Sequence, residues 1–382
     1  MMRLLKKWLW QQEIDSSEWE ILEGGNRNAM NVLVLSEYIN ATYFISFDIP
    51  LRKLHGDGKV NFAAASQKWI ASASHWVQLA DKFQPDVVIM TRYGESHGQD
   101  ILVDFRRRRI PVIYHIDDDL LEIPESLGSE IQKRQGAGSV VDTRRYLLQH
   151  CDLIYASTGN LAELMQQRFP SQIVVHGIYA PYMGEELKPN VTANDNCGRQ
   201  VIGYMGSKGH QHDLELVVPT LERLLAERPN LEFEVFGTIR MPAALERFGP
   251  RVRSYSVQKS YTEFLATLAS LGWAVGLAPL QDEPFNHCKA PTKFIEYTAC
   301  GIAVVASRIP VYEEAIPPNG GLLVERDWHS ALTNLLDHPQ QRQDAVAIAR
   351  HHCALKYAPE VLKQQLISIV DSVIKRKIND PH

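Results

Sequence analysis

Residues 289–307 read KAPTKFIEYTACGIAVVAS, and this stretch decides which fold the chain adopts. Pro291 suits the first turn of a helix, because its missing N–H would have no intrahelical partner there. Gly301 and the apolar run 302–307 follow at once, and such a run is typical of a strand buried on both faces. A polar helix that leads into a buried strand is one repeat of an α/β protein.

The same alternation of strands and helices extends through most of the chain. In the first half, apolar runs predict strands at 31–36, 86–90, 112–116, 153–157 and 173–175, with a helix at 62–83. In the second half, strands are expected at 201–205, 231–236, 273–279, 302–307 and 321–324, with helices at 212–227, 261–270 and 292–300. An amphipathic helix follows at 359–375. This pattern indicates two parallel sheets, each covered by helices on both faces.

A polar segment separates the two halves. Residues 184–200 (GEELKPNVTANDNCGRQ) have the Pro, Asn and Gly content of a linker. A length of 382 residues also favours two domains, at roughly 100–200 residues each. The predicted parts are a basic amphipathic extension (1–28), a first Rossmann-like domain (29–183), the linker (184–200), a second Rossmann-like domain (201–358) and a closing helical segment (359–382).

Composition excludes several classes of protein. The chain is 45% hydrophobic and 22% charged, as in an ordinary globular protein. A net charge of −5 argues against a general nucleic-acid binder, so we expect no nucleic-acid partner. The five cysteines are scattered and form no C-x-x-C pair, which favours a reducing cytoplasm over a zinc site or a disulfide framework.

The N-terminal residues 1–12 (MMRLLKKWLWQQ) are too few to span a bilayer, which takes about 20 apolar residues. They also lack the small-residue cleavage site of a signal peptide. On a helix, their apolar side chains would lie opposite the basic ones. Two interpretations stay open: peripheral contact with the inner face of the plasma membrane, and packing on the protein itself or on a partner.

The opening stretch contains the first candidate site. A helix N-terminus presents free N–H groups and a partial positive charge, and Lys289, Thr292 and Lys293 stand at this one. Together they predict an anion site. Glu296 shares a face with Lys293 and is placed to accept hydrogen bonds from a vicinal diol such as ribose. The alternative is a surface Lys–Glu pair, which would contribute less than about 1 kcal/mol to stability.

A second candidate site lies in IGYMGSKGHQHDLELV, residues 202–217, where a predicted strand runs into a glycine-containing loop. Small residues let backbone N–H groups approach a phosphate closely. The order of residues matches neither G-x-G-x-x-G nor a Walker sequence. Asp213 is interpreted as a cap of the helix that follows. The candidate phosphate contacts are Gly206, Ser207, Lys208 and His210.

A third candidate site lies in VIYHIDDDLLEIPE, residues 112–125, where a strand ends at His115 and three successive aspartates, including Asp117 and Asp118, follow. Adjacent carboxylates repel one another unless solvent or a partner compensates them. Three roles are open: a metal site for nucleotide phosphates, a helix N-cap cluster, and binding or deprotonation of an acceptor hydroxyl. We favour the last role and expect no metal.

These motifs resemble those of GT-B glycosyltransferases, specifically the retaining bacterial group 1, or family-four-like, enzymes. The resemblance is carried by DEPFNHCKAPTKFIEYTACGIAVVAS (282–307), IGYMGSKGHQHDL (202–214) and YHIDDDLLEIP (114–124), and weaker similarity covers most of the chain. It implies two facing Rossmann-like domains with a cleft between them. The second domain would hold most of a nucleotide-sugar donor, and the last helix would cross back to the first.

The resemblance also implies roles for individual residues. Glu296 resembles the glutamate that binds the donor ribose, and Lys293, Gly206 and Ser207 fall where donor phosphates are contacted. His115 falls where some relatives place a catalytic or acceptor-side histidine. Residues 40–54 (NATYFISFDIPLRKL) resemble an acceptor-facing loop. The acceptor candidates in this loop are Asn40, Thr42 and Tyr43.

The chain departs from the family pattern at Cys288. The family has two glutamates with seven residues between them, and the first would fall at this cysteine, which cannot make a carboxylate contact to the donor sugar. The candidates for that contact are Asp282, Glu283, Asn286 and Lys289. The departure leaves the identity of the sugar open.

The expected function is therefore transfer of a hexosyl or deoxyhexosyl group from a nucleoside-diphosphate sugar to a hydroxyl of a bacterial surface glycan or lipid-linked glycan, such as O-antigen or capsule, with retention. The donor is a substrate, and no further cofactor is expected. Other glycan-assembly enzymes are candidate partners. Two alternatives stay open: a GT-B nucleotide-sugar epimerase or hydrolase, and a non-catalytic nucleotide-sugar- or glycan-binding subunit.

Overall fold

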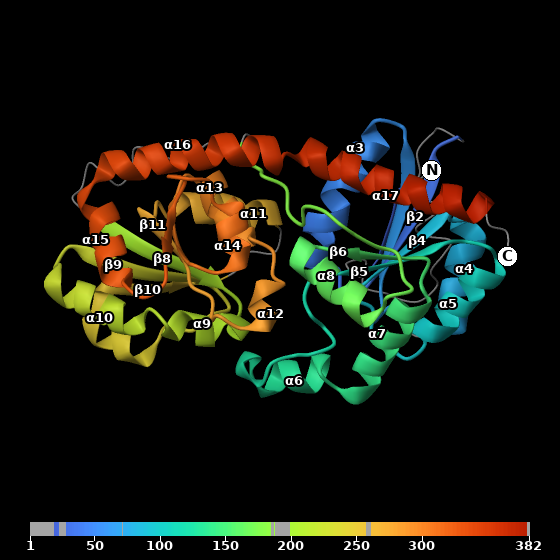
Figure 1. The fold of residues 1–382 in the computed structure, drawn as a ribbon, viewed down its shortest axis with the longest axis horizontal. Coiled ribbons are helices and arrows are strands. Elements are labelled where there is room, and N and C mark those ends of the chain that lie inside the picture. Colours follow the sequence, from blue (N-terminus) through green and yellow to red (C-terminus); the bar gives the residue numbers. More distant parts are fainter. Residues whose placement is uncertain are drawn as a thin grey trace. The chain divides into compact units, whose positions relative to one another are not determined.

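A computed structural model describes residues 19–22, 28–70, 72–184, 187, 199–256 and 261–379. The predicted extension (1–28) and linker (184–200) lie largely outside these residues. The chain forms two compact units (Figure 1). Unit 1 takes its described residues from Met1–Ile123, Lys133–Tyr179 and Pro359–His382, and unit 2 takes them from Pro124–Gln132 and Ala180–Ala358.

Unit 1 is built on a seven-stranded sheet in the order β1-β3-β2-β4-β5-β6-β7. All neighbours pair in parallel except β1, which pairs antiparallel with β3 at one edge. The chain builds outward from β2 to β3 on one side and then to β4 on the other, which makes the β2/β4 boundary a topological switch point. The strands are β1 (Trp19–Leu22), β2 (Met30–Ser36), β3 (Val60–Ser66), β4 (Val87–Thr91), β5 (Val112–Ile116), β6 (Leu153–Ala156) and β7 (Val174–His176).

Helices cover this sheet, as the buried, near-continuous apolar strands require. α17 (Pro359–Asn379) packs against α3 and adds Leu366 and Val370 to the core of the unit, which accounts for its apolar stripe. The other helical segments of the unit are α2 (Ala41–Tyr43), the π-helical turn η1 (Phe44–Asp48), α3 (Ile49–Gly56), α4 (Ala73–Phe83), α5 (Gly98–Arg107), α7 (Gly138–His150) and α8 (Gly159–Arg168).

The prediction of a helix at 62–83 is wrong in its first part. Residues Val60–Ser66 form β3, and helix begins only at Ala73. The segment VNFAAAS contains three alanines, which have high helix propensity, and no alternation of polar and apolar residues. Pairing with β1 and β2 and burial override that propensity here.

Unit 2 is built on a six-stranded parallel sheet in the order β10-β9-β8-β11-β12-β13. Its switch point lies between β8 and β11, because the chain builds from β8 toward β10 and then from β11 toward β13. The strands are β8 (Gln200–Gly206), β9 (Leu231–Gly237), β10 (Val252–Tyr255), β11 (Val275–Ala278), β12 (Ala303–Ser307) and β13 (Leu322–Val324).

The helical segments of unit 2 mostly follow the predicted ones. The prediction at 261–270 is confirmed, while the helix expected at 212–227 is interrupted after Glu215 and restarts at Val218, with Pro219 in its first turn. The segments are η3 (Lys208–His210), α9 (Gln211–Glu215), α10 (Val218–Glu227), η4 (Ala243–Arg251), α11 (Tyr261–Ser270), α12 (Pro284–His287), α13 (Thr292–Ala299), α14 (Pro310–Ala315), α15 (Trp328–Asp337) and α16 (Pro339–Lys356).

The division of the chain differs from the predicted boundaries at one internal segment and at the end of the first domain (29–183), since residues 180–183 also group with unit 2. Residues Pro124–Gln132, expected within the first domain (29–183), group with unit 2. They include η2 (Glu125–Leu127) and the start of α6 (Ser129–Gln135). The reason is packing: a Cβ built at Gly209 would meet the Ile131 side chain at 2.9 Å and the Leu127 side chain at 3.9 Å. A loop of this kind leaves no signature in the hydrophobic pattern.

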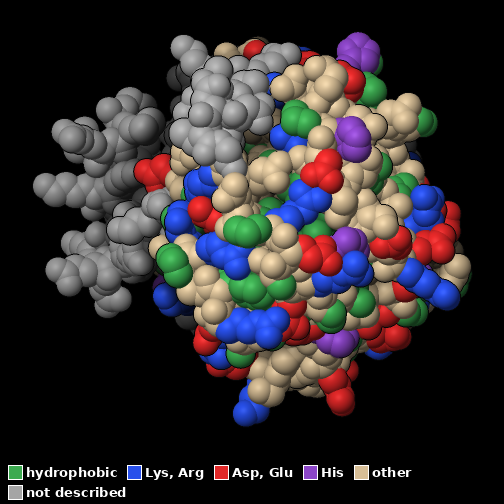
Figure 2. Space-filling view, turned by 90° about the vertical axis from the view of Figure 1, so that its left-hand side faces the viewer, with side chains coloured by type: hydrophobic (Ala, Val, Ile, Leu, Met, Phe, Trp, Pro, Cys, Tyr) green, Lys and Arg blue, Asp and Glu red, His purple; other side chains and the backbone are tan. Residues whose placement is uncertain are grey.

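The surface of unit 2 over α10 and α15 carries mixed charge. Figure 2 shows basic and acidic side chains interspersed over this face. Among them, Arg228 pairs with Asp337 at 2.6 Å, and His329 lies 2.8 Å from Glu227. Exposed pairs of this kind contribute about 0–1 kcal/mol each. We interpret this face as solvated.

Candidate functional site

The loops after β8 and β9 in unit 2 hold each other in place. The Gly206 carbonyl accepts hydrogen bonds from the N–H groups of Thr238 and Ile239, both at 3.1 Å. Gly237 has a φ of +125°, and a Cβ there would lie 2.2 Å from the Gly206 oxygen. The backbone N–H of Lys208 donates to Thr238 Oγ1 at 3.2 Å. The glycine-containing loop is therefore a fixed turn at the carboxyl end of the switch strand.

Asp213 joins this loop to the one after β11. Its Oδ1 accepts the Gln281 backbone N–H at 3.0 Å and the Asn286 amide at 3.4 Å, and its Oδ2 lies 2.9 Å from His210 Nδ1. Burial alone raises the pKa of Asp213, but the hydrogen bonds from His210 and from the Gln281 N–H and the charge of Lys293 outweigh burial and lower it. The predicted helix cap is thus a buried carboxylate that ties two loops together.

The two predicted lysines lie beside aromatic rings of unit 2. Lys293 Nζ is 5.5 Å from the centre of the Tyr204 ring, and Lys289 Nζ is 4.5 Å from that of Phe285. Tyr204 lies on β8 and its hydroxyl donates to the His210 carbonyl oxygen at 3.4 Å. The Lys293 contact places the first turn of α13 next to β8, which leads into the glycine-containing loop.

Glu296 lies one turn deeper on α13 and is buried, with 7% of its surface exposed. Its Oε1 accepts a hydrogen bond from the Tyr261 hydroxyl at 2.9 Å. Burial raises the pKa of Glu296 to about 7, against smaller opposing effects of Tyr261 and Lys293. A carboxyl group in an apolar setting with one hydroxyl partner is a strong acceptor site for a further hydroxyl.

The candidates to replace the family's first glutamate differ in exposure. Asp282 is exposed and accepts a hydrogen bond from His287 Nε2 at 2.6 Å. Asn286 is buried, and its amide donates to the Gln281 carbonyl at 3.0 Å and to Glu283 at 3.2 Å, as well as to Asp213. Cys288 is also buried. The hydrogen bonds of the Asn286 side chain therefore stabilise the loop after β11.

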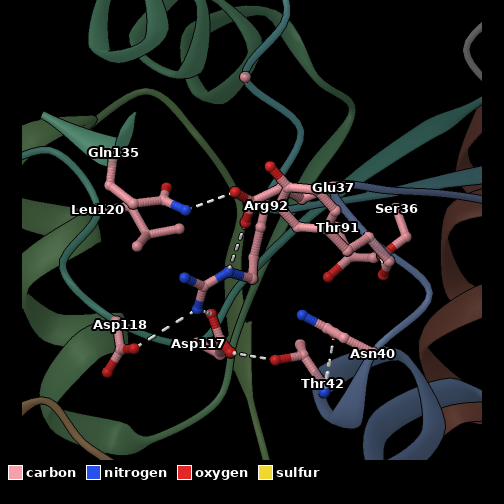
Figure 3. Close-up of polar contacts among 12 residues, drawn as sticks. Ser36, Glu37, Asn40, Thr42, Thr91, Arg92, Asp117, Asp118, Leu120 and Gln135 are labelled. Atoms are coloured by element: carbon pink, nitrogen blue, oxygen red, sulfur yellow. Dashed lines mark hydrogen bonds and ion pairs between the residues drawn. The ribbon is translucent and has the colours of Figure 1, made fainter. Parts of the chain in front are cut away.

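In unit 1, the carboxyl ends of the switch strands meet around Arg92, which follows β4 directly. Arg92 has a φ of +55°, a left-handed conformation that is uncommon for a side chain of this size. Its guanidinium donates to Glu37 at 3.0 Å, to Asp117 at 2.5 Å and to Asp118 at 3.5 Å (Figure 3). One arginine thus compensates three carboxylates that follow β2 and β5.

A second arginine, Arg144, is fully buried and contacts the backbone of Arg92. Arg144 on α7 donates to the carbonyl oxygens of Gln135 at 3.0 Å and of Arg92 at 3.4 Å, and also to the Gln135 side chain. The Gln135 amide in turn donates to Glu37 at 2.5 Å (Figure 3). The result is one connected polar network beneath the switch point, and a network of this kind is stable only when its members stay paired.

Asp117 has its oxygens occupied. Oδ1 faces Arg92, while Oδ2 accepts hydrogen bonds from the hydroxyls of Thr42 and Tyr179, both at 3.1 Å. Burial alone raises the pKa of Asp117, but the charge of Arg92 and the hydrogen bonds from Arg92 and Thr42 outweigh burial and lower the pKa. A stabilised carboxylate of this kind is a weak base, and it holds the side chains of Thr42, Tyr179 and Arg92 in place.

His115 is enclosed by aromatic rings. The rings of Phe47 and Tyr155 are both 4.9 Å from it centre to centre, and Tyr179 stacks at 6.5 Å. Nδ1 lies 2.9 Å from Thr91 Oγ1. Burial lowers the pKa of His115 to about 4, with Arg92 in the same sense and Asp117 opposed. The imidazole is therefore neutral near neutral pH.

The three predicted acceptor-loop residues have different surroundings. Asn40 is exposed and caps α2, accepting hydrogen bonds from the N–H groups of Thr42 and Tyr43. The Thr42 hydroxyl donates a hydrogen bond to Asp117 Oδ2 at 3.1 Å. The Tyr43 side chain lies in the core of unit 1, with 0% of its surface exposed, so this residue faces the interior.

Sequence reasoning missed several residues of both clusters. In unit 1 they are Glu37, Arg92, Arg144 and Tyr179, and in unit 2 they are Tyr261 and, as a link between loops, Asp213. Glu37 stands directly after the predicted strand 31–36, and Arg92 is the first charged residue after the predicted strand 86–90, so a rule that flags the first charged residue after each parallel strand finds both. Arg144 and Tyr179 have no such signal, since their contacts are set by tertiary packing.

Within the described residues, no three or more His, Cys, Asp and Glu side chains gather in a way that could hold a metal ion. In the same residues, no helix is both long and apolar enough to cross a membrane.

Comparison with known proteins supports the resemblance read from the motifs. A family model described as "Glycosyl transferase-like" matches residues 218–368. A curated relative is the GDP-mannose-dependent monoacylated alpha-(1-6)-phosphatidylinositol monomannoside mannosyltransferase of Corynebacterium glutamicum. It is 23% identical over 163 residues, which is 41% of this chain and 43% of the relative. The match therefore spans less than half of the relative's length.

Solved structures resemble the chain over most of its length. Sucrose-phosphate synthase from Thermosynechococcus elongatus has a TM-score of 0.65 at 13% identity, covering 91% of this chain and 100% of that chain. Alr3699/HepE from Anabaena in complex with UDP has a TM-score of 0.60 at 13% identity, covering 90% of this chain and 100% of that chain. The predicted fold class is confirmed: the protein has the GT-B fold with two Rossmann-like domains. Residues 218–368, which are similar to the glycosyl transferase-like family, lie in the second of these domains and in the helix that follows it.

Proposed function

We propose that the protein transfers a sugar from a nucleoside-diphosphate sugar to an acceptor hydroxyl. One observation carries the proposal. Lys293 lies over the ring of Tyr204 on β8, Lys289 and Lys293 both act electrostatically on His210 in the loop after β8, and Glu296 lies one turn further along the same helix as Lys293. Open α/β sheets bind ligands at the carboxyl end of switch strands such as β8. The two lysines can bind the diphosphate of a nucleotide, and the buried carboxyl group of Glu296 can accept hydrogen bonds from the ribose hydroxyls.

In this proposal the diphosphate lies between the lysines, the start of α13 and the Gly206–Ser207 turn, and the ribose diol donates to Glu296. The lysines and the turn stabilise negative charge as the sugar–oxygen bond breaks, which is the step where preorganised positive groups lower the barrier most. Because they already supply positive charge at the diphosphate, the transfer needs no metal ion. HepE was solved with UDP and with UDP-glucose, which makes a UDP-sugar a reasonable first donor to test.

Unit 1 supplies the acceptor side of the proposal. Neutral His115 is the group that accepts or orients the acceptor hydroxyl, and Asp118, with 25% of its side chain exposed, is the more accessible carboxylate. Asp117 positions Thr42, Tyr179 and Arg92. We propose a bacterial surface or lipid-linked glycan as acceptor and retention at the anomeric carbon, both by analogy with the family that the motifs resemble.

The proposal is tested by a thermal-shift panel of nucleotide sugars followed by turnover assays on the hits. A bound donor should raise the melting temperature, because ligand that binds only the folded state stabilises it. His115→Gln should keep the thermal shift and lose roughly 10-fold in transfer rate, the size of a lost hydrogen bond that orients the acceptor hydroxyl. His75→Gln, a partly exposed histidine of α4, is the matched control and should transfer normally. A panel with no thermal shift, or a His115→Gln enzyme at full rate, contradicts the proposal.

A second function is kept open by Cys288. A buried thiol stands where the family has a donor-binding carboxylate, which would suit a subunit that binds nucleotide sugars without turning them over. The same panel separates the two. Thermal shifts together with no product from any donor and glycan acceptor tried would favour the binding subunit.

A further inference from the structure

His210 and Asp213 form a rigid pair inside unit 2. Both oxygens of Asp213 are engaged, because Oδ1 accepts two hydrogen bonds from the loop after β11 and Oδ2 faces His210 Nδ1 at 2.9 Å. The carboxylate cannot turn away without breaking the contacts with Gln281 and Asn286. The orientation of the imidazole is therefore fixed before any ligand arrives.

This contact also fixes where the hydrogen of the imidazole lies. An ionised carboxylate only accepts hydrogen bonds, so Nδ1 of His210 must carry the hydrogen. In a neutral ring, Nε2 then has a lone pair and is itself an acceptor. Burial and the positive charge of Lys293, followed by that of Lys289, lower the pKa of His210 to about 3 against the opposing effect of Asp213. The ring is thus neutral when the site holds no ligand.

A neutral His210 conflicts with the phosphate contact that the sequence predicts. Diphosphate oxygens are acceptors, and they would meet the acceptor nitrogen of the ring. The conflict disappears when an anion binds, because Lys289 and Lys293, whose charges disfavour a proton on the ring, are the cations that the anion would neutralise. Added negative charge nearby further favours the imidazolium form.

We propose that His210 takes up one proton from solvent when the diphosphate of a nucleotide sugar binds, and that its Nε2–H then donates to a diphosphate oxygen. Asp213 stays ionised throughout and acts as a positioning residue. The inference rests on the proposed donor site and adds to it a third positive group, which appears only in the occupied state.

The surroundings of the ring are consistent with this coupling. The charged groups that act on it are Asp213 from α9, Lys289 from the loop after α12 and Lys293 from α13. From β8, the Tyr204 hydroxyl donates to the backbone carbonyl of His210. The His210 side chain is 21% exposed, so it is in contact with solvent.

The proton uptake is measured by titration calorimetry of UDP-glucose and GDP-mannose at pH 6.5 in buffers with different ionisation enthalpies. These diphosphate diesters have no phosphate group that titrates near neutral pH. Wild type should take up close to one more proton per bound ligand than His210→Gln. The variant should bind about 10- to 100-fold more weakly, as expected for a lost hydrogen bond to a charged group. His212→Gln, an exposed neighbour on α9, is the matched control and should give the wild-type count.

The outcomes separate the inference from the donor site. Equal proton counts for wild type and His210→Gln, with binding intact, overturn the inference and leave the donor site standing. Failure of wild type to bind either nucleotide sugar overturns both. If His210→Gln loses all binding, nitrogen NMR of ¹⁵N-histidine-labelled wild type decides: an Nε2 shift to the protonated value on adding ligand supports proton uptake, and an unchanged neutral value rejects it.

Discussion

Glu296→Gln is expected to weaken nucleotide-sugar binding by roughly 100-fold while leaving the fold intact. At pH 8, above its raised pKa of about 7, Glu296 is ionised. A hydrogen bond to a charged acceptor contributes about 1.5–3 kcal/mol, and with glutamine the ribose diol would lose at least one such bond. The glutamine oxygen can still accept the Tyr261 hydroxyl, which preserves the one contact that the structure shows at Oε1. Titration calorimetry with the tightest donor of the panel measures the loss.

Glu325→Gln is the matched control for this result. Glu325 also belongs to unit 2, but its side chain is 69% exposed and it faces Arg308 at 3.5 Å. It should bind the donor like wild type. Equal affinities of Glu296→Gln and Glu325→Gln would remove Glu296 from the site.

Without ligand, the free energy of unfolding of Glu296→Gln should depend on pH differently from that of wild type. Burial raises the pKa of Glu296 to about 7 from an ordinary value of 4.5. Between these two pH values the unfolded chain has lost the proton and the folded protein retains it. The contribution of Glu296 to the free energy of unfolding therefore falls as pH rises through this window, by up to about 3 kcal/mol.

This contribution is isolated by difference. The lowered pKa values of His115 and His210 change stability in the opposite sense, since folding with neutral histidines costs more as pH falls. Subtracting the unfolding free energy of Glu296→Gln from that of wild type removes their effect. The difference should fall between about pH 4.5 and 7 and stay level outside that range, whereas a difference independent of pH contradicts the raised pKa.

Arg92→Met is expected to destabilise unit 1 by about 3–5 kcal/mol. Its loss leaves Glu37 and Asp117 facing each other with no guanidinium between them, and a buried carboxylate without its partner costs several kcal/mol. The Arg92 side chain is only 16% exposed, so solvent cannot replace the lost contacts. Chemical denaturation of wild type and variant measures the change.

Arg108→Met is the matched control. Arg108 also contacts two aspartates, Asp81 at 2.5 Å and Asp104 at 2.9 Å, but at the surface, where such pairs contribute about 0–1 kcal/mol. A loss of stability in Arg92→Met no larger than in Arg108→Met would mean that the network around Arg92 is not a stabilising feature.

The fold could be predicted from the sequence where the apolar runs are uninterrupted. The strand at 112–116 and the helix at 261–270 coincide with β5 and α11, because burial and periodicity agree there. β3 could not be predicted as a strand, because its three alanines favour a helix. β10 (VRSY) has too few apolar residues to be distinguished from a loop. Both strands depend on pairing with neighbouring strands: β3 pairs with β1 and β2, and β10 pairs with β9.

The site could be predicted where motif and topology coincide. Lys293, Glu296 and His210 follow from their positions next to strand ends. The proton uptake that we propose for His210 does not, because it depends on Asp213 being held by a loop nearly 70 residues away, at Gln281. Arg92 shows the same limit: its partner Glu37 lies 55 residues earlier in the sequence, and no spacing rule connects them.

The central claim is that a nucleoside diphosphate binds to unit 2 at the start of α13. A crystal structure of the protein with the nucleoside diphosphate that gives the largest thermal shift tests it most directly. The account predicts diphosphate oxygens within hydrogen-bond distance of Lys293 and ribose hydroxyls on Glu296. A nucleotide that lies elsewhere, with Glu296 still bonded only to Tyr261, would contradict it.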